Sequence, residues 1–123
     1  MLDDEDYILE ILELTLTHLG YEVVLAKDGA EALQRFAQAE EKGVLINGAI
    51  LDLTIPGGMG GRELVGQLRA RYPLLPIFAS SGYSEDPVMG DPKAFGFTDS
   101  ICKPYRRNEV AELLERNLKK PAQ

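Results

Sequence analysis

The stretch "AILDLTIPGGMGG" at residues 49–61 decides the fold, because it passes from an apolar run to one carboxylate and then to a glycine-rich turn. A short continuous apolar run that ends at turn residues is typical of a strand buried on both faces. Asp52 stands at the end of this run, and Pro56 and four glycines follow it. The pattern therefore puts an acidic side chain at a strand end, where it could be a ligand, a nucleophile or a helix cap.

Composition limits the class of protein. The chain has 123 residues, a formal net charge of −7 and one cysteine, Cys102. This length suits a single core, so we expect residues 1–123 to form one domain. The negative charge argues against nucleic acid as a partner. No apolar run reaches the roughly 20 residues of a membrane span, and no secretory signal opens the chain. A lone cysteine cannot form an internal disulfide, so we expect a cytoplasmic domain without membrane contact.

Strand-like and helix-like segments alternate along the chain. Apolar residues at helical spacing predict helices, and β-branched or continuous apolar runs predict strands. The predicted helices cover 8–19, 29–41, 61–72 and 106–120, with an interrupted one at 86–96, and the predicted strands cover 21–26, 48–53, 76–82 and 99–103. Parallel strands joined by right-handed helical crossovers form a doubly wound α/β sheet.

Polar side chains gather at the expected strand ends. In open parallel sheets, ligands bind outside the carboxyl ends of the strands. Asp52, Ser80 and Lys103 each lie at or near such an end, and Asp3 and Asp4 lie where a first strand would end. Carboxylates this close repel one another unless cations compensate. Lys103 supplies one positive charge, and Mg²⁺, which prefers oxygen ligands, would supply more.

These residues resemble those of the receiver domains of two-component response regulators, over nearly the whole chain. The matching motifs are "LDDE" at 2–5, "LDLTIPGGMGG" at 51–61, "SSG" at 80–82 and "KPY" at 103–105. Each is short, and their order at successive strand ends makes them specific together. The variant "TIPGGMGG" with "SSGYSEDPVM" is most similar to receivers attached to hybrid sensor histidine kinases. The resemblance implies a flavodoxin-like, three-layer fold with five parallel strands in the order 2-1-3-4-5.

Carried over residue by residue, the resemblance makes Asp52 the acceptor of a phosphoryl group from a histidine kinase or phosphotransfer domain. It implies that Ser80 hydrogen-bonds the phosphoryl group and that Lys103 pairs with it. The implied Mg²⁺ ligands are Asp4 directly, Asp3 mostly through water, Asp52, and the backbone carbonyl of Thr54. The domain would be a signalling element rather than an enzyme, passing on its signal by conformational change or phosphotransfer.

Three features extend or qualify the resemblance. Many receivers carry Tyr or Phe three residues before the lysine, and here that position is Ser100, so we expect any conformational output to use other contacts. The glycines after Asp52 are not a phosphate-binding P-loop, because no Gly-Lys-Ser/Thr follows, and we expect a flexible turn. We also expect a cis peptide between Lys103 and Pro104, since X-Pro bonds adopt cis far more easily than others.

Two other functions stay open at this point. Haloacid dehalogenase-like phosphatases also phosphorylate an aspartate at a strand end, but they need a second aspartate two residues later, where this chain has Thr54. A receiver-like interaction module without phosphorylation is the other alternative, supported by Ser100. The cognate kinase, the input and output signals, and the oligomeric state do not follow from the sequence.

The first strand is unusually short. Only Met1 and Leu2 precede Asp3, whereas strands usually run about 5–6 residues. In the order 2-1-3-4-5 this strand would be central, and its absence would leave backbone groups unpaired on 21–26 and 48–53. We expect apolar residues upstream of Met1, with residues 1–3 still pairing beside "AILDL"; exchange of a strand between two molecules is the alternative.

Overall fold

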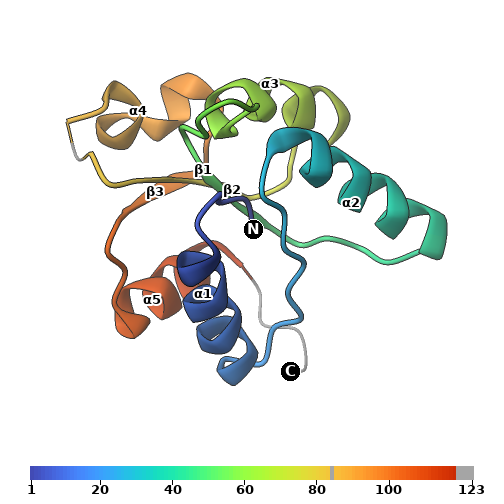
Figure 1. Cartoon of the computed structure of the whole chain (residues 1–123), viewed down its shortest axis with the longest axis horizontal. Coiled ribbons are helices and arrows are strands. Elements are labelled where there is room, and N and C mark those ends of the chain that lie inside the picture. Colours follow the sequence, from blue (N-terminus) through green and yellow to red (C-terminus); the bar gives the residue numbers. More distant parts are fainter. Residues whose placement is uncertain (84, 119–123) are drawn as a thin grey trace.

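Helices alternate with strands over most of the chain. The structure, a computed structural model, describes residues 1–83 and 85–118 and is shown in Figure 1. Its elements are α1 (Asp6–His18), α2 (Gly29–Lys42), β1 (Ala49–Asp52), α3 (Gly61–Arg71), β2 (Ile77–Ser81), α4 (Pro87–Gly90), the 3₁₀ helix η1 (Pro92–Phe95), β3 (Asp99–Cys102) and α5 (Arg107–Asn117). None of the helices in this part of the chain has the length and apolar composition of a membrane span.

The three strands form a parallel sheet in the order β1-β2-β3. The register pairs Asp52 with Ser80 and Ser80 with Ile101, so the carboxyl ends of the strands lie level. Helices cover both faces, with α1 and α5 on one side and α2 and α3 on the other (Figure 1). The predicted α/β class with a parallel sheet is therefore confirmed.

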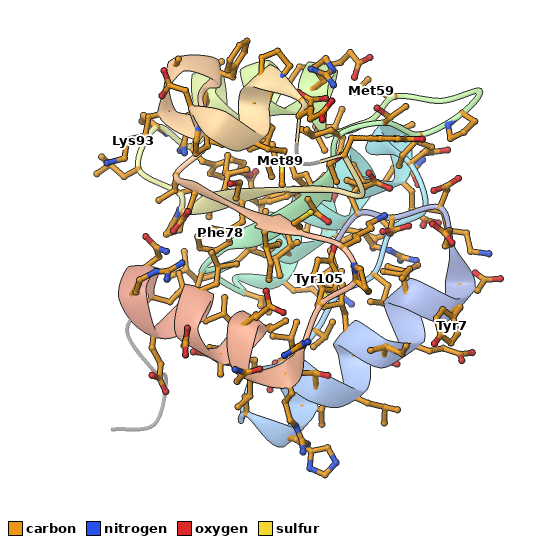
Figure 2. The ribbon with its side chains drawn as sticks, turned by 90° about the vertical axis from the view of Figure 1, so that its left-hand side faces the viewer. Tyr7, Met59, Phe78, Met89, Lys93 and Tyr105 are labelled. Atoms are coloured by element: carbon orange, nitrogen blue, oxygen red, sulfur yellow. The ribbon has the colours of Figure 1, made fainter. Side chains whose placement is uncertain are left out.

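Strand side chains alternate between two apolar cores, as the pleat of a sheet requires. Ile50, Phe78 and Ile101 pack with the buried side chains of α1 and α5. Leu51, Ile77 and Ala79 pack on the opposite face, with residues of α2 and α3. Figure 2 shows Phe78 and Tyr105 on the side of the sheet that faces α5 and α1. Because both faces are covered, β1 and the first three residues of β2 read as continuous apolar runs in the sequence.

The described residues form three of the five expected strands. Residues 21–25 are not in a strand, and Leu2 forms only single parallel bridges, with Ala26 on one side and Leu51 on the other. The physical reason is that the short segment at Leu2 pairs with Ala26 at one step of a parallel ladder only. Residues 21–25 then have no neighbouring strand among the described residues with which to form a ladder. The expected pairing of residues 1–3 beside β1 is confirmed by bonds from Leu2 N–H to Ile50 O and from Asp52 N–H to Leu2 O.

Local chemistry accounts for the other boundaries. The Asp28 carboxylate accepts from Glu31 N–H at the start of α2, and Gly43 ends that helix in the left-handed conformation. The weak segment 86–96 splits into α4 and η1, as its glycine and prolines predict. The Lys103–Pro104 peptide is cis, as predicted. The predicted helix 106–120 is observed over Arg107–Asn117, and residues 119–120 lie outside the described residues.

The glycines after Asp52 allow a tight turn and close packing, whereas the expected flexibility of this turn stays a prediction. Gly57 has a φ of +75°, which favours glycine. A Cβ on Gly60 would lie 2.6 Å from Leu53 O, and one on Gly61 would lie 2.7 Å from Leu51 Cβ. The chain can therefore turn back tightly after β1 and start α3 against the strand that carries Asp52.

We predict that Gly60→Ala lowers the free energy of unfolding by about 1–3 kcal/mol, because the new methyl group overlaps a backbone oxygen that cannot move freely. The matched control is Gly66→Ala inside α3, where a Cβ would meet nothing within 4 Å. Alanine should raise stability there by about 0.5–1 kcal/mol. Urea denaturation measures both, and equal effects at the two positions would contradict the close-packing explanation.

Candidate functional site

Asp52 lies at the carboxyl end of β1 and is almost completely buried, with 7% of its surface exposed. Its neighbour across the sheet is Ser80, which is 1% exposed. Thr54 N–H donates a hydrogen bond to Asp52 Oδ1 at 3.4 Å, where the chain leaves the strand. The strand end therefore holds a carboxylate and a hydroxyl side by side, away from bulk water.

Lys103 joins two of the carboxylates. Its Nζ lies 2.9 Å from Asp52 Oδ2 and 2.6 Å from Asp3 Oδ2. The Glu5 carboxylate is further away, at 4.0 Å. Lys103 follows β3, whereas Asp3 follows the bridge made by Leu2, so elements far apart in the sequence meet at one ammonium group. The predicted convergence of Asp3, Asp52 and Lys103 at the strand ends is present in the structure.

Burial and pairing act in opposite directions on the acid–base chemistry of the site. Burial raises the pKa of Asp52, the nearby charge of Asp3 raises it further, and the hydrogen bond from Lys103 only partly offsets both. Burial alone would lower the pKa of Lys103, but its bonds to Asp3 and Asp52 outweigh burial and raise it. One positive charge thus serves two buried carboxylates, and the site keeps an excess of negative charge.

The first turn of the chain supplies further oxygen ligands. Carboxylate oxygens of Asp3, Asp4 and Glu5 lie within 4.8 Å of one another, with Asp3 buried and the other two exposed. Asp3 Oδ2 is buried and forms an ion pair with Lys103. A set of neighbouring carboxylates with one ammonium group beside it fits a hard cation such as Mg²⁺.

The structure adds Glu5 to the predicted acidic residues and places the N–H group of Thr54 at the site. Glu5 was not singled out in the sequence, although it directly follows the acidic pair and its carboxylate joins the cluster. The only sequence signal for it was its place in "LDDE". Thr54 lies at the site through its N–H group, and the role of its carbonyl as a ligand remains a prediction.

Tyr105 reaches the site from the α1–α5 side. Its ring packs on the core cluster of that face, and its hydroxyl forms a hydrogen bond with Ser80 Oγ. Burial raises the pKa of Tyr105 to about 12, so the hydroxyl stays protonated at neutral pH. No motif in the sequence signals the bond of Tyr105 to Ser80. Ser100, at the position of the usual aromatic residue, instead donates to Met89 O at 3.1 Å.

The family assignment follows from comparison with known proteins. The sequence model of the response regulator receiver domain matches residues 1–115, so the chain belongs to this family. It is 33% identical over 112 residues to the alkaline phosphatase synthesis transcriptional regulatory protein PhoP of Bacillus subtilis (strain 168). That match covers 89% of this chain and 43% of PhoP, so the chain spans less than half the length of that relative.

Solved structures agree with this family and with the flavodoxin-like receiver fold. The chemotaxis protein CheY4 of Vibrio cholerae is 31% identical with a TM-score of 0.82, over 95% of this chain and 94% of CheY4. A response regulator of Chloroflexus aurantiacus J-10-fl is 29% identical with a TM-score of 0.82, over 97% of this chain and 94% of the other. The chain is therefore a receiver domain, a signalling unit of two-component systems. This family assignment argues against a haloacid dehalogenase-like phosphatase.

We predict that Asp52 makes the protein less stable as the pH rises. Because the pKa of Asp52 is raised in the folded state, the folded protein binds more protons above the ordinary pKa of 3.8. The free energy of unfolding should therefore fall, relative to that of Asp52→Asn, as the pH rises from about 4 to about 7. Urea denaturation of both proteins in EDTA measures this difference. A difference that grows in favour of the wild type with pH would contradict the raised pKa.

Proposed function

We propose that this receiver domain takes a phosphoryl group from a phosphohistidine onto Asp52. The observation that carries the proposal is the shared contact of Lys103 Nζ with Asp52 and Asp3 at the carboxyl ends of the strands. Family membership supports the same assignment. The donor would be a histidine kinase or a histidine-containing phosphotransfer domain.

The side chains of the site have distinct roles in this proposal. An Asp52 oxygen forms the new P–O bond while the P–N bond of the donor breaks, and the electron pair stays on the imidazole nitrogen. Lys103 neutralises negative charge on the transferring oxygens, which is the main demand that phosphoryl transfer makes on a protein. The Ser80 hydroxyl donates to a phosphoryl oxygen from the neighbouring strand.

The acidic cluster provides the cation site. Asp4 and Asp52 would hold Mg²⁺ with the Thr54 carbonyl, and Asp3 would act mostly through water, with Glu5 as an additional oxygen donor. Bound Mg²⁺ supplies charge neutralisation for the phosphoryl oxygens. The same carboxylates crowd one another without a cation, which favours binding.

The wider context is part of the proposal. We expect a cytoplasmic domain without membrane contact, because the chain has a single cysteine and no apolar run long enough for a membrane span. We expect its partners to be proteins rather than nucleic acid, because its net charge is −7. The motif variant after Asp52 suits a receiver of a hybrid sensor kinase. The strand order 2-1-3-4-5 is supported by the bridges of Leu2 to both Ala26 and Leu51. A receiver-like module without phosphorylation is the alternative that the next experiment separates.

We predict that acetyl phosphate with Mg²⁺ adds the mass of one phosphate to the wild-type chain, as a linkage stable to acid and labile to base. Asp52→Asn keeps the size of the side chain but removes the nucleophilic oxygen, and it should gain no mass. EDTA should abolish the gain in the wild type. Intact-mass spectrometry over time measures all three conditions.

Asp86→Asn is a suitable control for the loss of a carboxylate, because Asp86 accepts hydrogen bonds from Arg62 and Val88 away from this cluster. It should be labelled like the wild type. Labelling of Asp52→Asn at the wild-type rate would overturn the assignment of the acceptor. A wild-type chain that gains no mass from acetyl phosphate or from a phosphorylated kinase would favour the interaction module.

A further inference from the structure

The hydroxyl groups of Tyr105 and Ser80 form a hydrogen bond at the edge of the site that holds Asp52. Tyr105 belongs to the segment between β3 and α5, whereas Ser80 lies in β2 and is paired with Asp52 of β1. The bond therefore joins an aromatic side chain from outside the sheet to the residue that stands beside the proposed phosphoryl acceptor.

Two ends of the Tyr105 side chain are held by different parts of the fold. The ring is partly buried and packs on the core cluster between the sheet and the helices α1 and α5, on the side where Figure 2 shows it. The hydroxyl is bonded to Ser80. Burial is the main influence on the pKa of this hydroxyl, and the charges of Lys103, Asp3 and Asp52 act on it as well. The hydroxyl thus lies within electrostatic reach of the charged cluster.

Ser80 has a hydroxyl that water hardly reaches, because only 1% of the residue is exposed. Among the described residues, Tyr105 is the hydrogen-bond partner of this hydroxyl. The hydrogen bonds that the described residues donate to the Asp52 carboxylate come from Thr54 N–H and Lys103 Nζ. The Ser80 proton is therefore not committed to Asp52 in this structure.

The direction of the bond between the two hydroxyls decides what Ser80 can do. A serine hydroxyl has one proton and can also accept hydrogen bonds. A phenol has an ordinary pKa of about 10, which makes it more acidic than an aliphatic hydroxyl and the stronger donor of the two. Burial raises the pKa of Tyr105 to about 12, so its proton is present at neutral pH. With Tyr105 as the donor, the Ser80 proton is free for a second acceptor.

An oxygen of a phosphoryl group on Asp52 is such an acceptor. Hydrogen bonds to ionised acceptors are roughly twice as strong as those between neutral groups. Ser80 lies at the neighbouring strand end, in register with Asp52. A donor that is oriented before the reaction costs no reorganisation when charge develops on the oxygen beside it. A fixed Ser80 hydroxyl would therefore favour the transfer more than a freely rotating one.

We infer that Tyr105 is a positioning residue for phosphoryl transfer to Asp52, an inference that rests on the proposed function. The Tyr105 hydroxyl donates to Ser80 Oγ and so directs the Ser80 proton to a phosphoryl oxygen. Tyr105 acts through Ser80 and does not itself contact the transferred group. Neither hydroxyl gains or loses a covalent bond in the transfer.

The test is a double-mutant cycle on the rate of phosphorylation by acetyl phosphate with Mg²⁺. Tyr105→Phe keeps the ring and removes only the hydroxyl. In the wild-type background it should slow the reaction by about three- to tenfold, the range of one hydrogen bond. In the Ser80→Ala background it should have no effect, because the pathway through Ser80 is then already lost.

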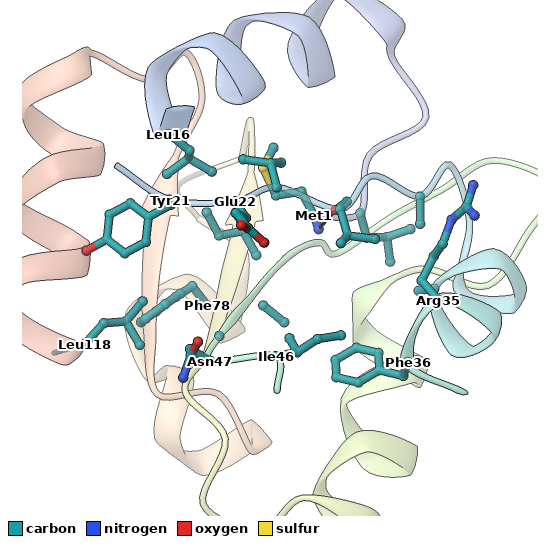
Figure 3. Close-up of a pocket in the computed structure, with 18 of the residues that line it drawn as sticks. Met1, Leu16, Tyr21, Glu22, Arg35, Phe36, Ile46, Asn47, Phe78 and Leu118 are labelled. Atoms are coloured by element: carbon teal, nitrogen blue, oxygen red, sulfur yellow. Dashed lines mark hydrogen bonds between the residues drawn. The ribbon is translucent and has the colours of Figure 1, made fainter. Parts of the chain in front are cut away.

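Tyr21→Phe is the matched control, because Tyr21 is also partly buried and packs on the same core cluster as Tyr105. Figure 3 shows Tyr21 at an apolar groove whose lining residues do not include Ser80 or Asp52. Among the described residues its hydroxyl has no hydrogen-bond partner. The control removes a hydroxyl from the same core without touching Ser80, so it should leave the rate of phosphorylation unchanged.

The affinity for trifluoroberyllate with Mg²⁺ provides a second cycle that needs no turnover. This anion imitates a phosphoryl group on a carboxylate, so the cycle stays measurable where Ser80→Ala is labelled too slowly. Tyr105→Phe should weaken binding by a similar factor in the wild type and leave it unchanged in Ser80→Ala. Urea denaturation of each variant accompanies both cycles, and the slowing should not follow the loss of stability.

Equal slowing by Tyr105→Phe in both backgrounds would show a structural role and overturn the inference, as would an unchanged rate in the wild-type background. A faster reaction in Tyr105→Phe would show that Tyr105 competes for the Ser80 proton, which also overturns it. Failure of the proposed function looks different, because the wild-type chain itself then gains no phosphate and binds no trifluoroberyllate.

Discussion

The ammonium group of Lys103, shared between Asp52 and Asp3, is the interaction on which the rest of the site depends. It joins the strand end that carries Asp52, the residue that follows β3, and the start of the chain. Two buried carboxylates at one place would repel each other without it, and breaking such a buried pair commonly costs about 3–5 kcal/mol. The fold contributes by bringing the three carboxyl ends level, so that side chains from distant parts of the sequence meet there.

The same arrangement explains why the site suits a cation. Lys103 offsets only part of the negative charge of the clustered carboxylates, and a cation would offset the rest. Ser80 on the neighbouring strand β2 and Tyr105 between β3 and α5 add a pair of hydrogen-bonded hydroxyl groups. Position 100, occupied by serine, is tied to Met89 O and is directed at α4 instead. In this receiver domain Tyr105 brings an aromatic hydroxyl to Ser80, the residue paired with Asp52 across the sheet.

Much of the fold and site could be predicted from the sequence, because both rest on local patterns. Continuous apolar runs identified β1 and β2, and the rule that ligands gather at the carboxyl ends of parallel strands brought Asp3, Asp52 and Lys103 together. Residues 21–26 were predicted as a strand because Val23 and Val24 favour one, but a strand also needs a partner, which residues 1–3 supply only at one step. The Tyr105–Ser80 bond depends on the packing of α5 against the sheet, and no local pattern encodes it.

The most direct test of this account is an NMR titration of the Asp52 carboxyl group in the wild type and in Lys103→Met, in the absence of divalent cations. Loss of the ammonium group removes the largest contribution that favours the ionised side chain, while burial, Asp3 and the hydrogen bond from Thr54 N–H remain. The account predicts that the pKa of Asp52, already above its ordinary value, rises further in the variant. An unchanged or lower pKa in a folded Lys103→Met protein would contradict it.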